Sequence, residues 1–313
     1  MPRFIELFRP FVKLLPDVTK PDRRVAFNEK LFWTAMALVV YLVMSEVPLI
    51  GVGKGGAQDP LGALRVIFAS NRGTLMELGI GPIVTAGLIL QILSGSKMIN
   101  VDMTSPEDRS LFTGASKVLA VVMTVFEALA FILGGAYGAI AIRTQLAILA
   151  QLAAAGIILM LLDELLQKGW GIGSGISLFI AAGVAQRIWW DMVAPVGPME
   201  DKKYLGALIS FVQSIQMGEG IQGLYRGGGL PDMVGLITTI VVIVVVIYMN
   251  GLKVSIPVSY AKYRGFRGTF PIKFLYVSNI PVIFAAALFG NVYFITQMIW
   301  QRYNQANTNF WLN

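Results

Sequence analysis

The 313-residue chain contains no cysteine and no histidine. These two absences exclude thiol catalysis, disulfide cross-links, histidine general bases and metal sites built from Cys and His. Charged residues are scarce as well, at 14% of the chain, against about 25% in soluble proteins. Hydrophobic residues make up 56% of the sequence, and its mean hydropathy is +0.68. The composition therefore predicts a polytopic membrane protein.

The apolar residues are gathered into runs long enough for membrane-spanning helices, each of which needs about 20 mostly apolar residues. Seven such runs are residues 31–50, 78–96, 116–137, 144–162, 172–189, 232–250 and 274–299. Lys and Arg are concentrated between them, in residues 1–30, 97–117, 163–171 and 251–273. Because basic residues are enriched in cytoplasmic loops, we expect a cytoplasmic N-terminus and an all-α, polytopic transmembrane helix bundle.

Two further segments are amphipathic and are not expected to span. Residues 2–18 mix Phe, Leu and Val with Arg and Lys, which predicts an interfacial stretch within a cytoplasmic N-terminus of residues 1–30. Residues 203–216 place their apolar side chains on one helical stripe. We expect this helix on the outer face, within an outer loop of residues 191–231.

A short helix is predicted in "QDPLGALRVIFASNRG", residues 58–73. Asp59 followed by Pro60 is typical of a helix start, because Asp caps the first turn and Pro fits within it. The apolar face of this helix consists of Leu61, Leu64, Ile67 and Phe68. About 12 residues cannot cross a bilayer core of ~30 Å. The pattern alone leaves two alternatives, an ordinary outer-loop helix or a helix folded back into a cavity.

The segment "KGWGIGSGISLFIAAG", residues 168–183, has the glycine content of a phosphate-binding loop. A P-loop, however, needs Lys after its last glycine, whereas Lys168 precedes this run. A dinucleotide fingerprint needs a preceding strand, and the sequence here has no β pattern. The glycines are better explained by close helix packing or by irregular backbone that borders a cavity.

Glu127 lies near the middle of a predicted span, where a carboxylate is costly and functional by default. A proton relay, an ion ligand and a polar contact between helices are all open to it. Thr85 and Asn291 lie in other spans and are candidate partners. No second carboxylate at membrane depth is evident to face Glu127, which argues against an ion-coupled transporter or an aspartyl protease.

A basic loop is predicted between the last two spans, where aromatic residues are interleaved with Lys262, Arg264, Arg267 and Lys273. It serves either as an orientation signal attracted to lipid or as a surface that contacts RNA phosphates. Upstream, "SPEDRSLFTG" (residues 105–114) has Ser, Pro and two acids in the order of a capped helix start.

Four long phrases occur in a characteristic order along the chain. They are "GTLMELGIGPIVTAGLILQIL" (73–93), "SPEDRSLFTG" (105–114), "LLDELLQKGWGIGSGISLFIAAGV" (161–184) and "FPIKFLYVSNIPVIFAAALFGN" (270–291). Together they resemble the SecY family, the α subunit of the protein translocase, in its archaeal and eukaryotic branch. The resemblance runs from residue 1 to about residue 300.

The resemblance implies a role for several residues. The short helix, at about residues 59–71, would be the plug that closes the channel from outside. The hydrophobic pore ring would be formed by Ile80, Val84, Ile176, Ile180 and Ile283, and the physics agrees, because Ile80/Val84 and Ile176/Ile180 are i, i+4 pairs on one helix face. Thr85, Glu127 and Asn291 would form a polar cluster at the lateral gate, and the basic loop would face the ribosome.

The same resemblance implies the partners and the location. We expect the small SecE/gamma-type and beta-type translocase subunits, ribosomal RNA, signal sequences, nascent polypeptides and membrane lipid. No catalytic residue, metal or cofactor is expected, and the location would be an archaeal plasma membrane. The chain would be the central pore-forming subunit of a protein-conducting channel.

The sequence departs from the family at its C-terminal side. The family has ten spans in two halves, whereas seven are predicted here: five in residues 31–190 and two in residues 232–301, which enclose the basic segment 251–273. Residues 302–313 would be an outer tail. The alternatives are a polytopic secondary transporter, which would need coupling-ion ligands near the midplane, and a truncated, non-conducting fragment.

Overall fold

The computed structural model describes residues 6, 8–52, 65–99, 101–138, 140–199, 203–259, 267–275 and 280–303. Its chain forms two compact units, residues 1–184 with 280–313 and residues 185–279. The first unit contains most of the predicted spans. Because each unit is compact on its own, each is described separately.

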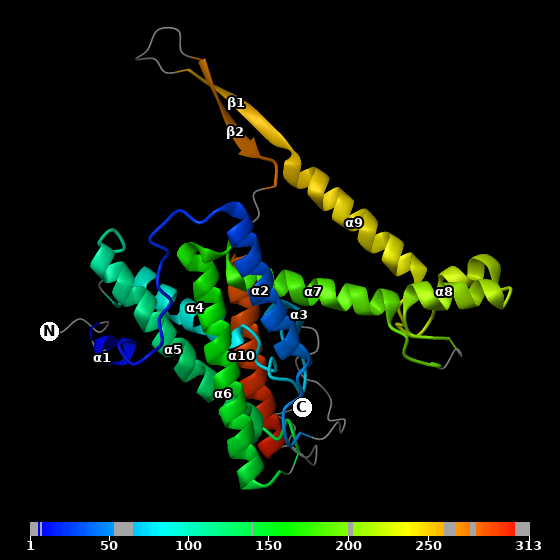
Figure 1. The fold of residues 1–313 in the computed structure, drawn as a ribbon, viewed down its shortest axis with the longest axis horizontal. Coiled ribbons are helices and arrows are strands. Elements are labelled where there is room, and N and C mark those ends of the chain that lie inside the picture. Colours follow the sequence, from blue (N-terminus) through cyan, green and yellow to red (C-terminus); the bar gives the residue numbers. More distant parts are fainter. Residues whose placement is uncertain are drawn as a thin grey trace. The chain divides into compact units, whose positions relative to one another are not determined.

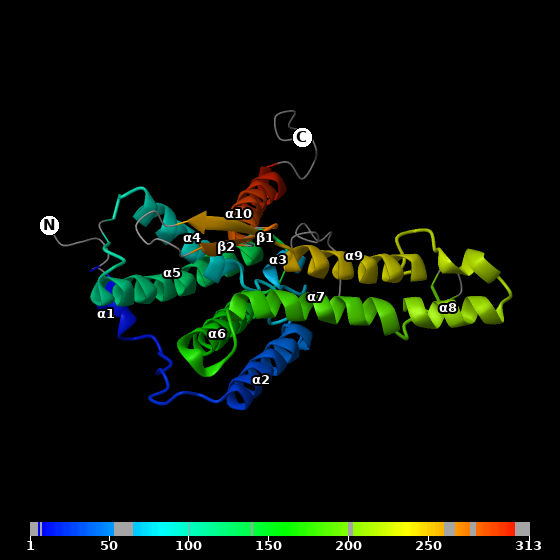
Figure 2. The same cartoon turned by 90° about the horizontal axis from the view of Figure 1, so that it is seen from above.

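The first unit is a bundle of helices (Figure 1). Its elements are α1 (Arg9–Val12), α2 (Phe27–Glu46), α3 (Arg65–Phe68), α4 (Gly81–Gly95), α5 (Pro106–Leu133), α6 (Ile142–Leu165), the π-helical turn η2 (Leu166–Trp170), the first half of α7 (Gly175–Val193) and α10 (Ile280–Tyr303). Helix α5 packs between α4 and α6 (Figure 1 and Figure 2), and α10 packs against α4.

Helix boundaries follow local sequence chemistry. Helix α2 ends at Glu46, just before Pro48, as expected because the residue before a proline disfavours the helical conformation. Helix α5 begins at Pro106, ten residues before the predicted span, because its polar first turns are helical as well. Ser105 occupies the N-cap position but makes no side-chain cap hydrogen bond, so the expected Ser cap is wrong. Instead, the Asp108 carboxylate accepts the backbone N–H of Asp102 at 2.9 Å.

Every predicted span overlaps a helix, but the helices differ in length. Among the described residues, four helical segments are long and apolar enough to cross a membrane: Phe27–Glu46, Pro106–Leu133, Ile142–Trp170 and Met233–Gly251. Helix α4 has 15 residues, which makes it about 22 Å long at 1.5 Å per residue. It is therefore shorter than a bilayer core, and its N-terminus meets α3 instead of continuing as a helix.

One large apolar cluster forms the core of the first unit. Tyr41 of α2 stacks on Phe179 of α7, with ring centroids 5.2 Å apart. Around this pair pack buried side chains from α2, α3, α4, α6 and α10, among them Ala37, Phe68, Ile80, Val84, Leu159 and Ala287. A second cluster, around Phe131 and Leu152, joins α5 to α6. The core thus lies where the predicted pore-lining segments meet.

The second unit comprises the end of α7, α8 (Ala207–Gln216), the 3-10 turn η3 (Gly220–Leu224), α9 (Met233–Gly251) and the strands β1 (Lys253–Ser259) and β2 (Arg267–Lys273). Helix α8 lies within the predicted amphipathic segment 203–216. Asp232 caps α9 by accepting the Gly235 N–H at 2.6 Å. The strands pair antiparallel, with Lys253 opposite Lys273 and Ile256 opposite Phe270. Neither strand was predicted from the sequence, although the fold remains the expected helix bundle.

Candidate functional site

Five isoleucine and valine side chains meet in the core of the first unit. Ile80 and Val84 of the α4 segment are buried, at 0% and 3% exposure, and Ile283 of α10 is 8% exposed. Ile176 and Ile180 of α7 are half-buried and pack against the same cluster. The structure therefore brings together all five residues that the resemblance assigned to the pore ring. We call these five residues the apolar ring.

A cavity of about 600 Å³ opens beside the apolar ring. Val84, Ile176 and Ile283 line it from the ring, and Lys117 and Lys168 line it with polar side chains. The rest of its wall comes from α4, α5, α6, η2, the start of α7, α10 and two residues outside the helices, Lys20 and Ser174, all within the first unit. The cavity thus has apolar walls next to the ring and charged groups among its lining residues.

The described part of the predicted plug consists of α3 and the residues that follow it, up to Gly73. We call residues 65–73 the plug segment. Leu61 and Leu64 lie outside the described residues, whereas Ile67 and Phe68 belong to α3. Phe68 is buried in the same core cluster as the apolar ring. Its carbonyl oxygen accepts the N–H of Ile80 at 2.8 Å, and the Tyr41 hydroxyl donates to the Ala69 carbonyl at 3.1 Å. The described part of this segment is therefore folded against the ring, whereas residues 58–64 of the predicted helix lie outside the described residues.

A buried ion pair, which the sequence analysis missed, also holds α3. Arg65 Nη2 lies 2.7 Å from Glu77 Oε1, and the two side chains are 9% and 2% exposed. The Glu77 carboxylate also accepts the Gly73 N–H. Glu77 and Glu127 line one small cavity of about 30 Å³. Glu77 is therefore a second buried carboxylate at this cavity, although it precedes the predicted span 78–96. A charge at each end of the segment 65–77 was the only sequence signal for this pair.

The three residues assigned to the polar gate cluster come together from α4, α5 and α10. Asn291 Nδ2 donates to Thr85 Oγ1 at 3.0 Å and to the Ala287 carbonyl at 2.8 Å. The Thr85 side chain hydrogen-bonds Glu127, which is buried. Of the three roles left open for Glu127, the observed hydrogen bond to Thr85 corresponds to a polar contact between helices.

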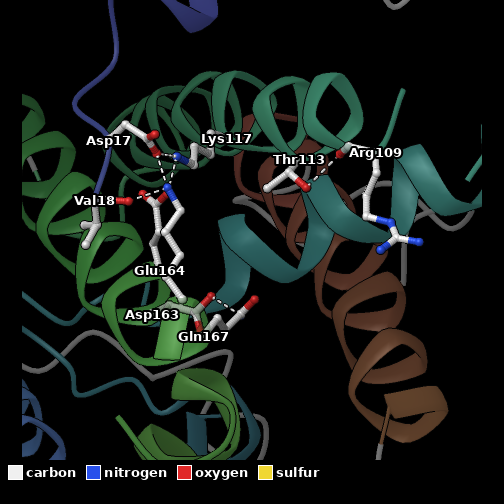
Figure 3. Close-up of polar contacts among 9 residues, drawn as sticks. Asp17, Val18, Arg109, Thr113, Lys117, Asp163, Glu164 and Gln167 are labelled. Atoms are coloured by element: carbon white, nitrogen blue, oxygen red, sulfur yellow. Dashed lines mark hydrogen bonds and ion pairs between the residues drawn. The ribbon is translucent and has the colours of Figure 1, made fainter. Parts of the chain in front are cut away.

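Four charged side chains form an alternating cluster beside the large cavity (Figure 3). Lys117 Nζ lies 2.5 Å from both Asp17 Oδ1 and Glu164 Oε1. Lys168 Nζ lies 2.6 Å and 2.7 Å from the same two carboxylates. Hydrogen bonding with Glu164, then with Lys117 and Lys168, holds the pKa of Asp17 below its usual range. We call this set the rim cluster. It ties the N-terminal segment to α5 and to the end of α6.

The predicted basic loop is only partly described. Lys262 and Arg264 lie outside the described residues, whereas Arg267 and Lys273 begin and end strand β2. Lys273 and its neighbour Phe274 are exposed. The alternating polar and apolar residues of "KVSIPVS" (253–259) were the signal that would have predicted a strand.

Comparison with known proteins places the chain in a family. The SecY family model matches residues 74–312, and the model for the plug domain of Sec61p matches residues 39–73. A structure described as a protein conducting channel is 39% identical, with a TM-score of 0.74. Sec61 from the canine endoplasmic reticulum, in a ribosome-channel complex, is 39% identical with a TM-score of 0.73. A SecY structure in which the plug domain is said to stabilise the closed channel is also 39% identical, with a TM-score of 0.71.

These matches cover 94% of this chain and 63–64% of the solved chains, so the chain spans just under two thirds of their length. The match to the plug domain includes α3 up to Gly73. The overall helical fold agrees with the matched structures. The chain is a multi-pass membrane protein that belongs to the SecY family.

Proposed function

We propose that the chain forms the central wall of a protein-conducting channel, which passes secretory polypeptides across the membrane and releases membrane segments sideways into it. The observation that carries this proposal is the apolar ring. Its five aliphatic residues come from three different helices and meet beside a large cavity, with the plug segment packed against them.

SecY proteins are channels and not enzymes, and the ring suits a channel physically. A narrow apolar constriction excludes water and therefore blocks ions. Aliphatic side chains are nevertheless free to part around an extended polypeptide, because they offer it no fixed hydrogen-bond partners. The ring would thus seal the resting channel and yield during transport.

The polar cluster of Thr85, Glu127 and Asn291 would serve as the lateral gate. Its hydrogen bonds join α4 to α10 across the helix interface, and burial makes them costly to break without replacement. A signal sequence that inserts between these helices would bias the open state through its higher affinity for that state.

The partners follow from the same proposal. The hairpin β1–β2, with its intervening segment that includes Lys262 and Arg264, would face the ribosome, as befits a relative of a protein studied in a ribosome-channel complex. Small SecE/gamma-type and beta-type subunits would complete the assembly. We further propose an archaeal plasma membrane and a cytoplasmic N-terminus, on the basis of the Lys and Arg distribution.

An ion-coupled transporter is less well supported. It would need free oxygen ligands for a coupling ion. Glu77, the second carboxylate at the small cavity, is instead neutralised by Arg65 at 2.7 Å.

Resting ion flux tests the proposed seal. Ile176→Ser and Ile283→Ser should each raise the ion flux through planar bilayers several-fold, because a hydroxyl lets water wet the constriction. Val244→Ser is the matched control, since Val244 is an exposed residue of α9. Ring variants whose resting ion flux equals that of the parent would contradict the proposal.

A further inference from the structure

Glycine residues bring the end of α6 and the start of α7 into close contact. Gly169 and Gly173 have positive φ values of 105° and 76°, in the left-handed region that favours glycine. A Cβ atom on Gly175 would lie 2.7 Å from the Cα of Asp163 and 2.6 Å from its Oδ1. The first residue of α7 is therefore in direct contact with the backbone of α6.

The carboxylate of Asp163 binds the free end of α7. Its Oδ1 accepts the N–H of Ile176 at 3.1 Å, and it also hydrogen-bonds the Gly175 backbone. Its Oδ2 accepts from Gln167 Nε2 at 2.8 Å (Figure 3). The first N–H groups of a helix have no partner within the helix, and a negative charge there is further stabilised by the helix dipole. Asp163 thus caps α7 from the neighbouring helix.

The capped residue is itself part of the apolar ring. Ile176 donates its N–H to Asp163, and its side chain packs in the ring cluster. Ile180 follows one helical turn later on the same face. A displacement of the start of α7 would therefore move two of the five ring residues together.

We propose that Asp163 is a positioning residue of the channel, which sets the width of the apolar ring by capping α7 and holding Ile176 and Ile180 in place. This inference rests on the proposed function, because it assigns Asp163 a role in the seal. Asp163 contributes no apolar side chain to the ring. It acts on the ring through its hydrogen bond with the backbone N–H of Ile176.

The absence of native cysteine allows a direct distance measurement. Spin labels at Gln91→Cys on α4 and Ser177→Cys on α7 would sit on two exposed residues that line the cavity. In this doubly labelled chain, Asp163→Ala removes the acceptor. The population with a displaced α7 should rise by roughly 2- to 30-fold, the range for loss of a helix cap. The resting ion flux should rise with it.

Two further variants separate capping from loss of charge or of folding. Asp163→Asn keeps an oxygen that accepts the Ile176 N–H, so it should retain the parent distance and the parent flux. Gly175→Ala keeps the carboxylate but forces the two backbones apart, so its label distance and ion flux should resemble those of Asp163→Ala. If Asp163→Ala fails to insert into the membrane, Gly175→Ala takes its place in the experiment. Glu107→Gln, an exposed acid in the first turn of α5, is the control for charge loss.

Three results would overturn the inference. The first is an unchanged distance in both Asp163→Ala and Gly175→Ala. The second is an Asp163→Asn variant as displaced as the alanine variant. The third is a displaced α7 with unchanged ion flux, which removes the link to the seal. If Ile176→Ser and Ile283→Ser still leak in that third case, the proposed function survives and only the role of Asp163 falls.

Discussion

Two glycine-rich joints lead into helices that carry the apolar ring, and they hold their helices by different means. Gly79-Ile80-Gly81 leads into α4, which begins at Gly81, and the run from Gly169 to Gly175 leads into α7, which begins at Gly175. In the first joint, the N–H of a ring isoleucine binds the Phe68 carbonyl of the plug segment. In the second, the corresponding N–H binds the Asp163 carboxylate of α6.

The difference indicates which side of the ring responds to the plug. Under the proposed function the plug segment leaves when the channel opens, so Ile80 would lose its partner, whereas Ile176 would keep its partner on α6. The α4 side of the ring should therefore relax on opening while the α7 side stays fixed. The two joints should therefore respond separately to substitutions.

The largest effect is expected at the buried ion pair of Arg65 and Glu77. Glu77→Leu leaves Arg65 without this partner in a buried site, which should weaken the seating of the plug by about 3–5 kcal/mol. Accessibility of a cysteine at Ile67 to a water-soluble maleimide should rise strongly. The double variant Arg65→Leu with Glu77→Leu should recover much of the protection. Equal accessibility in the single and double variants would contradict a pairing role.

A smaller effect is expected from Gly79→Ala. A Cβ atom there would lie 2.1 Å from the Phe68 carbonyl oxygen, and the φ of this glycine is +55°. Overpacking of this kind costs about 1–3 kcal/mol. The variant should expose the cysteine at Ile67 without displacing α7, whereas Gly175→Ala should displace α7 and leave that cysteine protected. If both glycine variants gave the same pair of results, the two joints would not be independent.

The smallest effect is expected from acid at the rim cluster. The pKa of Asp17 is lowered in the folded chain by hydrogen bonding with Glu164, Lys117 and Lys168. Its contribution to stability is therefore complete above its unfolded pKa of about 3.9 and is lost as the pH falls through the lower folded pKa. Because Asp17 is mostly exposed, we expect a loss of no more than about 1 kcal/mol, further reduced by salt.

Fluorescence of Trp170 offers a measurement of that loss, since its indole N–H donates to the Thr19 carbonyl at 2.8 Å. The fluorescence of Trp170 should change as the pH falls below about 4 in the parent. It should stay constant over the same pH range in Asp17→Asn. An identical acid transition in both would assign it to another group.

The helices could be predicted because each one is encoded by a long, continuous run of mostly apolar residues. Seven apolar runs gave seven helices, with shifts at the ends where polar turns remain helical, as at Pro106. The ring and gate residues were predicted from resemblance to a family, and spacing only agreed with them. Their meeting depends on α4, α5, α7 and α10 folding together, which no local pattern encodes.

The features that were missed all depend on contacts that a periodic pattern does not encode. Arg65 in α3 and Glu77 in the loop before α4 are twelve residues apart, and each looks like an ordinary surface charge. Asp163 lies at the end of an apolar run, where a carboxylate is usually solvated. The β hairpin was missed because its strands contain Pro257 and Pro271, which argue against strands despite the alternation in residues 253–259.

The central claim is that polypeptides pass through the apolar ring, and cross-linking tests it most directly. Single cysteines at Ile180 and Ile283 should form disulfides with a cysteine in a secretory chain stalled during transport, and a cysteine at Val244 of α9 should not. Cross-links from Val244 but none from Ile180 or Ile283 would contradict the account.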